Sequence, residues 1–238
     1  MPIEFTERDY KEGYWYYRPG EAFPPPGLSD PDKYSGEGRL SITGAPSISS
    51  KDQAKLTKRW IQVLPSLVNV RILWVSDKVS QVMFEAICGM HGLEALWLKW
   101  SGIKSIESVL KLKQLQSLHI GSSSQLQSVT PLTQLKQLRW LELENIKHIQ
   151  DISPIGECTQ LLGLGIDGSM WTTQKIKSLG PLGNLGELRY LSITNLRSED
   201  KTLKPIYRLR NLQRFHAAKW WEPVEIEELK RINLRLEV

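Results

Sequence analysis

The chain has 238 residues, of which 40% are hydrophobic and 24% are charged, so it is long enough to bury one hydrophobic core. No segment reaches the roughly 18 uncharged apolar residues of a membrane-spanning helix, and residues 1–4 do not begin a secretory signal, so we expect a cytoplasmic protein. The formal net charge of +5 suggests a nucleic-acid partner, but the dispersed placement of the basic residues argues against one.

Residues 1–36 differ in kind from the rest and form an aromatic and proline-rich arm. Its rings are Tyr10, Tyr14, Trp15, Tyr16, Tyr17 and Phe23, followed by three prolines and a glycine at 24–27. Disordered segments are usually poor in aromatic residues, so we expect the arm to pack on the remaining domain, 37–238, and to cover its N-terminal end. A docking arm for a partner is the alternative.

A strand and two helices are predicted between the arm and residue 92. Residues 38–42 look like a degenerate first strand. A helix over 48–64, capped by Ser49 or Ser50, presents an apolar face that consists of Ala54, Leu56, Trp60, Ile61 and Leu64. A second helix over 79–90 is expected to bury Val82, Met83, Ala86 and Ile87.

From residue 70 onward one pattern recurs, Leu-x-x-Leu-x-Leu with conservative replacements. Its copies start at Val70, Leu93, Leu115, Leu138, Leu161, Leu188 and Leu212, with spacings of 23, 22, 23, 23, 27 and 24 residues. A second register follows each of the later copies, with a proline and then apolar residues three apart, at Pro131, Pro154, Pro181 and Pro205. Proline and a spacing of three favour single 3₁₀ turns over long helices.

These two registers together resemble the leucine-rich repeat family, and Asp-Ile-Ser-Pro-Ile at 151–155 resembles the short repeats of internalin-type proteins. The resemblance implies an α/β fold. It is a curved solenoid of about eight repeats with a parallel concave β-sheet, short helices and 3₁₀ turns on the convex side, and caps at both ends. The C-terminal cap is expected over 221–238, with a helix at 223–230. An insertion at 168–173 is expected to project Trp171.

Strand alternation predicts which side chains face the concave surface, because the motif leucines must face the core. The central column is Trp74, Trp97, His119, Glu142, Gly165, Ser192 and His216. With their neighbours, the predicted partner-binding residues are Trp74, Trp97, Lys99, Trp100, His119, Trp140, Glu142, Glu144, Asp167, Trp171, Tyr190, Arg214 and His216. We expect the rings to be solvent-directed, as in protein interfaces, although they can also stack on one another or lie under the arm.

Three features of this surface bear on its chemistry. Glu142, Glu144 and Asp167 form an acidic centre that suits a lysine or arginine of a partner. A hydrolase that uses two carboxylates needs a cleft that excludes water, and an open sheet does not provide one. Glycines at 163, 165 and 168 are expected to leave room for a bulky partner group. His119 and His216 are about 19 Å apart by strand spacing, too far for one metal ion, so no metal or other cofactor is predicted.

The sequence therefore predicts a non-enzymatic protein–protein interaction module, monomeric when free, whose partner has a basic or convex surface. An immunity-type protein that neutralises a cognate toxin is one such role, and a carbohydrate- or peptidoglycan-binding module is the alternative. Neither a membrane nor a nucleic acid is expected as partner, because the basic residues lie on connections: Lys104, Lys111, Lys113, Lys136, Lys147, Lys175, Lys177, Lys204, Arg208 and Arg210. Cys88 and Cys158 are expected to be unpaired.

Overall fold

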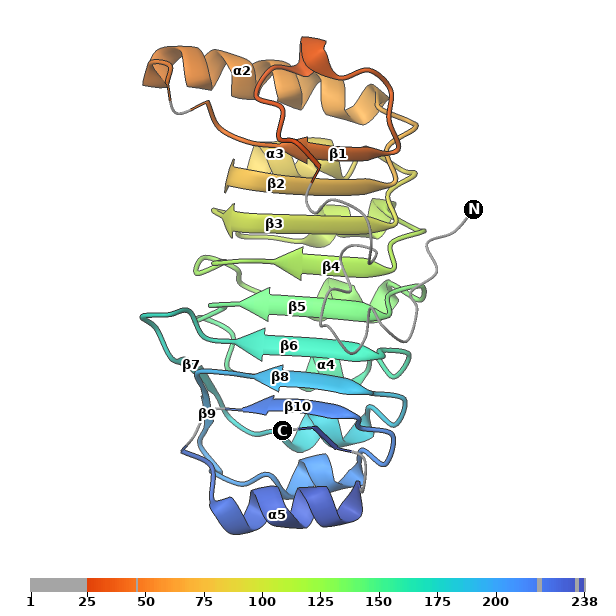
Figure 1. The fold of residues 1–238 in the computed structure, drawn as a ribbon, viewed down its shortest axis with the longest axis vertical. Coiled ribbons are helices and arrows are strands. Elements are labelled where there is room, and N and C mark those ends of the chain that lie inside the picture. The colour runs from red at the N-terminus through yellow and green to blue at the C-terminus, as the bar shows by residue number, and fades with distance from the viewer. Residues whose placement is uncertain (1–24, 46, 218–219, 234–235, 238) are drawn as a thin grey trace.

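A computed structural model describes residues 25–45, 47–217, 220–233 and 236–237. Its main element is a parallel sheet of eight strands in the order β1-β2-β3-β4-β5-β6-β8-β10 (Figure 1). The strands are β1 (Arg39–Ile42), β2 (Ile72–Val79), β3 (Ala95–Ser101), β4 (Ser117–Ile120), β5 (Trp140–Glu144), β6 (Gly163–Asp167), β8 (Tyr190–Ile193) and β10 (Arg214–Ala217). Each strand pairs only with its neighbours along the stack, as expected for a curved leucine-rich repeat solenoid.

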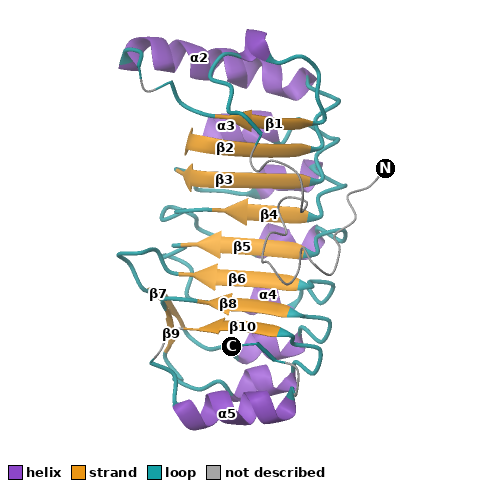
Figure 2. Cartoon of the chain, viewed as in Figure 1, coloured by secondary structure: helices purple, strands orange, loops and turns teal. Residues whose placement is uncertain are grey.

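Short helices and turns lie behind the sheet in Figure 2, and the two longest helices lie beyond its two ends. The longer helices are α2 (Ser50–Val63), α3 (Gln81–Ile87) and α5 (Pro223–Ile232). The short elements are η1 (Pro31–Lys33), η2 (Leu64–Ser66), η3 (Glu107–Lys111), η4 (Thr130–Gln134), α4 (Ser153–Gly156), η5 (Gly180–Asn184) and η6 (Lys204–Arg208). The predicted use of 3₁₀ turns in the later repeats is confirmed, apart from the single α turn of α4.

The predicted register of the repeats is also confirmed. The middle leucines of the strand motifs are at most 2% exposed and belong to one continuous core: Leu96, Leu118, Leu141, Leu164 and Leu191. The residues between them lie on the opposite face of the sheet because successive strand side chains alternate. Cys88 and Cys158 are both buried and unpaired, as predicted.

The two early helices differ in part from their predicted apolar faces. Ser49 caps α2 by accepting a hydrogen bond from the backbone N–H of Asp52, and Trp60 is buried, but Ala54 is exposed. In α3 the buried residues include Phe84, while Val82 is 59% exposed. A helix turns about 100° per residue, so burying Phe84 places Val82 on the outer side.

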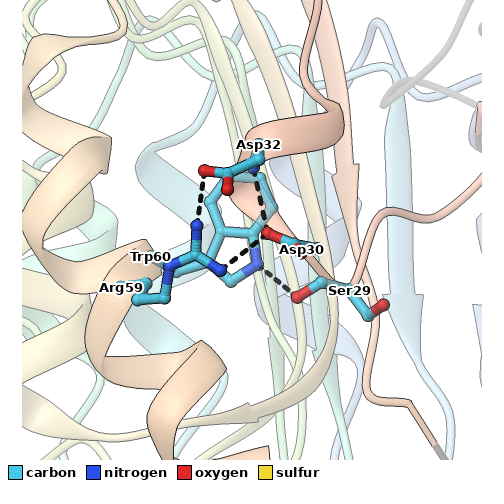
Figure 3. A network of polar contacts seen from close by, with 5 residues as sticks. All are labelled: Ser29, Asp30, Asp32, Arg59 and Trp60. Atoms are coloured by element: carbon cyan, nitrogen blue, oxygen red, sulfur yellow. Dashed lines mark hydrogen bonds and ion pairs between the residues drawn. The ribbon is translucent and has the colours of Figure 1, made fainter.

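The N-terminal end of the sheet is covered by residues 28–33 and α2. Leu28 forms a parallel bridge with Ile42 at the free edge of β1. The indole N–H of Trp60 donates to the carbonyl oxygen of Ser29 at 2.9 Å, and Arg59 pairs with Asp30 at 3.0 Å (Figure 3). Residues 1–24 of the predicted arm lie outside the described residues.

The C-terminal end is covered by α5, which confirms the helix predicted at 223–230. Leu229 of α5 is fully buried and Trp221 just before it is 6% exposed, so both contribute to the main core. Past α5, Glu237 forms one isolated parallel bridge with Arg214, in which the N–H of Phe215 donates to the carbonyl of Glu237 at 2.8 Å. Residues 234, 235 and 238 lie outside the described residues.

A second, two-stranded parallel sheet was not predicted from the sequence. Strands β7 (Gln174–Ile176) and β9 (Leu196–Ser198) pair beside the exits of β6 and β8. The insertion that precedes β7 projects Trp171 as predicted, with 89% of the residue exposed. The side-chain amide of Asn195 donates to two carbonyls of this loop and fixes its shape.

Candidate recognition surface on the concave sheet

The concave columns are arranged as the strand motifs predict. Trp74 lies opposite Trp97, which lies opposite His119, which in turn lies opposite Glu142. The next residue of this column is Gly165 on β6. Beyond Val75 the register of β2 against β3 shifts, so that Lys78 lies opposite Trp100. The central part of the predicted surface is therefore assembled by direct strand pairing.

The expectation that the large rings are exposed is wrong for three of them. Trp74 and Trp140 are completely buried, and Tyr190 is 2% exposed. Trp74 packs with Ile72 and Ala95 in a small apolar cluster on the concave side, separate from the main core. These rings therefore point away from the leucine core, as the register requires, but they fill space within the molecule.

The ring of Trp140 lies across the neighbouring strand. A Cβ atom on Gly163 would overlap the six-membered part of the Trp140 indole, so only glycine admits the ring there. On the far side of Gly163 the ring reaches Tyr190, with centroids 5.9 Å apart. The space at Gly163 is thus occupied by the protein's own tryptophan, which corrects the expectation that it receives a partner group.

Gly168 also serves the chain itself. A Cβ atom there would collide with the carbonyl oxygens of Asn195 and Thr172, which the insertion brings against the end of β6. Of the three glycines that were expected to leave room for a partner, Gly165 is the one beside the acidic residues. A Cβ atom at Gly165 would lie 2.9 Å from Cγ of Glu142 and 3.3 Å from Oδ2 of Asp167.

A connected row of side chains runs from β3 to β5. The rings of Trp97 and His119 are stacked, with centroids 5.0 Å apart and an angle of 23° between their planes. His119 Nδ1 lies 2.9 Å from Oε2 of Glu142. His119 is 8% exposed, less than predicted, while Trp97 and Glu142 are partly exposed. The histidine is held between an indole and a carboxylate, which fixes the position of that carboxylate.

The carboxylate of Asp167 is held by the next strand. Its Oδ1 accepts hydrogen bonds from the hydroxyl of Ser192 at 2.9 Å and from the N–H and hydroxyl of Thr194 at 2.6 and 2.8 Å. Burial raises the pKa of Asp167 to about 6, the negative charge of Glu142 adds to this, and the hydrogen bonds oppose it. The predicted set omits Ser192 and Thr194, although strand alternation alone places both on this face.

Glu144 completes the acidic group. It lies opposite Asp167 in the pairing of β5 with β6 and is partly exposed. Burial raises the pKa of Glu144, and the nearby charge of Glu142 acts in the same direction, while His119 opposes it. Glu142 and Asp167 therefore lie beside the bare backbone of Gly165, with Glu144 opposite Asp167, and we call these four residues the acidic notch.

The remaining predicted residues lie away from the acidic notch. Lys99 and Trp100 are both exposed at the end of β3, with the ammonium 4.4 Å from the ring centroid. At the other end of the sheet, Arg214 pairs with Glu237 at 3.2 Å, and His216 is exposed. Burial and the charge of Arg214 lower the pKa of His216.

The surface offers no grouping of metal ligands. Within the described residues, no cluster of three or more His, Cys, Asp or Glu side chains has a geometry that could hold a metal ion. The described helices also include none that is both long enough and apolar enough to cross a membrane.

Comparison with solved structures gives the same architecture. The chain is similar to an internalin (inlF) from Listeria monocytogenes, with a TM-score of 0.55 and 18% identity over 76% of this chain and 54% of that one. It is also similar to internalin C2 from the same organism, with a TM-score of 0.52 and 21% identity over 74% of this chain and 72% of that one. The chain thus spans about half of the first of these proteins.

Neither a protein-family model nor a curated protein matches the sequence. The assignment of the fold therefore rests on the repeat pattern, the eight-stranded parallel sheet and the two solved structures taken together. On that evidence, this chain has the leucine-rich repeat fold.

Proposed function

We propose that the chain is a non-enzymatic protein-recognition module that takes a cationic side chain of a partner protein into the acidic notch. The observation that carries this proposal is the placement of three partly exposed carboxylates around a residue without a side chain, at the middle of the concave face. Lysine and arginine are the side chains that such a group of carboxylates attracts, and arginine can bind a carboxylate through two parallel hydrogen bonds.

The surroundings of the notch favour binding over catalysis. Ser192 and Thr194 hold Asp167, so this carboxylate is fixed before a partner arrives, and Glu142 lies 2.9 Å from His119. Preorganisation of this kind lowers the cost of association. Because the hydroxyls of Ser192 and Thr194 are used to hold Asp167, the arrangement suits charge recognition rather than acid–base chemistry.

The partly exposed ring of Trp97 gives the notch an apolar border. Its position beside His119 places an aromatic surface next to the carboxylates, a combination that is frequent at the energetic centre of protein interfaces. The carbohydrate-binding alternative is less favoured, because Trp74 and Trp140 are buried and offer no flat surface for a sugar. The immunity-type role is the special case in which the cationic partner is a toxin.

The test compares two charge reversals of the same size. Glu142→Lys changes the notch, and Glu157→Lys makes the same change on an exposed position directly after α4 on the convex side. Partners are captured from the native source on the immobilised full chain, identified by mass spectrometry and titrated by calorimetry. We expect Glu142→Lys to weaken binding by about 2 kcal/mol or more and Glu157→Lys to leave it within about 0.5 kcal/mol.

The salt dependence provides a second criterion. Attraction between the notch and a cationic partner should weaken as ionic strength rises, and this sensitivity should be smaller in Glu142→Gln. Equal losses for the two charge reversals, or binding that depends on the convex lysines such as Lys136, would assign recognition to a different face. A captured glycan without a protein would favour the carbohydrate alternative.

A further inference from the structure

A pocket lies at the C-terminal rim of the molecule, away from the acidic notch. Its volume is about 240 Å³, and its lining combines two cationic side chains, two indoles, a hydroxyl and a carboxylate: Arg197, Ser198, Lys201, Trp220, Trp221 and Glu222. The pocket thus joins the end of β9 to the start of α5 and does not share a residue with the concave surface. It is smaller than the roughly 300–1,000 Å³ of pockets for drug-sized ligands, which restricts it to a small ligand.

One wall of the pocket is held in place by its own contacts. The indole N–H of Trp220 donates to the carbonyl oxygen of Leu196 at 2.9 Å, which anchors the ring against β9. The guanidinium of Arg197 lies over that ring, 4.8 Å from its centroid. Stacking orients the guanidinium in a plane and leaves its N–H groups at the edge free to bind an acceptor.

Two buried donors in the lining have no hydrogen-bond partner among the described residues. Ser198 is 5% exposed and Trp221 is 6% exposed, yet neither the Ser198 hydroxyl nor the Trp221 indole N–H makes a hydrogen bond. Buried polar groups are nearly always paired, and leaving one unpaired is unfavourable. Both atoms are covered by the surrounding protein, so other atoms of these two residues form the surface of the pocket.

The lining of the pocket has a net positive charge. Arg197 and Lys201 oppose the single carboxylate of Glu222. Lys175 lies directly opposite Arg197 in the pairing of β7 with β9, and both are exposed. The lining therefore combines a net positive charge with the apolar surface of the indoles.

We propose that this pocket binds a small organic carboxylate, with the carboxylate group at Arg197 and Lys201 and the apolar body against the indoles. This site goes beyond the proposed function on the concave face and is independent of it. A carboxylate accepts hydrogen bonds from both cationic side chains of the lining, and its pairing with a guanidinium is a strong, directional contact. The volume of the pocket excludes a large ligand.

The test uses phenylacetate as the probe and phenylacetamide as its neutral counterpart of nearly the same shape. The full chain, with ¹⁵N in its nine tryptophans, is titrated with each probe, and the indole N–H signals are followed by NMR. Trp220 and Trp221 are identified from Trp→Phe variants. We expect phenylacetate to shift the signals of these two residues in a saturable way while Trp97 stays unchanged, and phenylacetamide to bind at least about fivefold more weakly.

Three variants with exposed or unpaired side chains distinguish the site from a general positive surface. Arg197→Met should weaken phenylacetate binding about fivefold or more, and Glu222→Gln should strengthen it, since a repelling carboxylate is removed. Lys175→Gln removes a neighbouring charge that does not line the pocket and is the matched control, with a change below about twofold.

Several results would overturn the proposal. These are equal affinity for the acid and the amide, no saturable shift at Trp220 and Trp221, or losses in Lys175→Gln as large as those in Arg197→Met. Inorganic phosphate that binds as tightly as phenylacetate would also do so, since the apolar body would then contribute nothing. None of these results depends on a protein partner, so they leave the test of the acidic notch unaffected.

Discussion

At the scale of single residues, Asp167 has a structural role in the fold and also a binding role in the proposed function. One of its oxygens accepts three hydrogen bonds from Ser192 and Thr194, and the other lies on the side of Gly165. Three hydrogen bonds favour the charged form, but the pKa is still raised to about 6, because burial outweighs them.

This pKa predicts how stability depends on pH. A carboxyl group with a raised pKa binds its proton more tightly in the folded state, so its contribution to folding is greatest below pH 4 and is lost as the pH rises from about 4 to about 6. Asp167→Asn keeps an acceptor for Ser192 and Thr194 but removes the titration. In urea titrations between pH 4 and 7, wild type should lose roughly 1–2 kcal/mol relative to the variant, allowing for partial solvent contact. Parallel pH profiles for the two proteins would assign the shift to another group.

Gly163 provides a second test at this scale. Its missing side chain admits the buried ring of Trp140, so Gly163→Ala should force the ring to move and should destabilise the protein by about 1–3 kcal/mol. The control is Gly186→Ala, where a Cβ atom meets nothing within 4 Å, and it should stay within about 0.5 kcal/mol. Thermal unfolding followed by near-ultraviolet circular dichroism measures both the stability and the tryptophan environment. Equal stability of the two variants would show that the ring has room to shift.

At the scale of elements, the repeat register was predictable and its surroundings were not. Alternation in the strand motifs places Trp97, His119 and Glu142 side by side. The apolar motif residues must all face the core, so the residues between them must share the opposite face of the sheet. The same alternation gives the direction of a side chain but not its exposure. Trp140 is on the predicted face and is nevertheless buried, and the position of its ring depends on a glycine one repeat, 23 residues, later in the sequence.

The pair β7–β9 illustrates a second limit of sequence reasoning. Each strand is three residues long and follows an irregular segment, so neither has enough alternation to be recognised. Their pairing depends on the insertion folding back, which the partly buried Asn195 side chain secures through contacts 23 and 26 residues away in sequence. The pocket that we propose to bind a small carboxylate could not be predicted from the sequence for the same reason, since its lining comes from β9, a loop and the start of α5.

At the scale of the whole molecule, the linear strand order determines how a local defect spreads. Each strand of the main sheet pairs only with the strands before and after it, so β5 connects the half that contains α2 to the half that contains α5. In such an array, stability is approximately the sum of the repeats and of the interfaces between neighbours. A defect in a central repeat weakens two interfaces that both halves depend on, whereas a defect in β1 affects one end.

Two leucine truncations of equal size test this difference. Leu141 on β5 and Leu40 on β1 are at most 2% exposed, and truncating either to alanine removes the same atoms from the core. Leu141→Ala should cost about 2–5 kcal/mol and speed amide hydrogen exchange along the sheet from β2 to β8. Leu40→Ala should speed exchange chiefly in β1 and β2, because the remaining strands keep both neighbours.

If instead Leu141→Ala affected only β4 to β6, the repeats would open independently, and the acidic notch on β5 and β6 could open without the rest of the solenoid. Its carboxylates would then be held only by the contacts of His119, Ser192 and Thr194, and not by the cooperative stack.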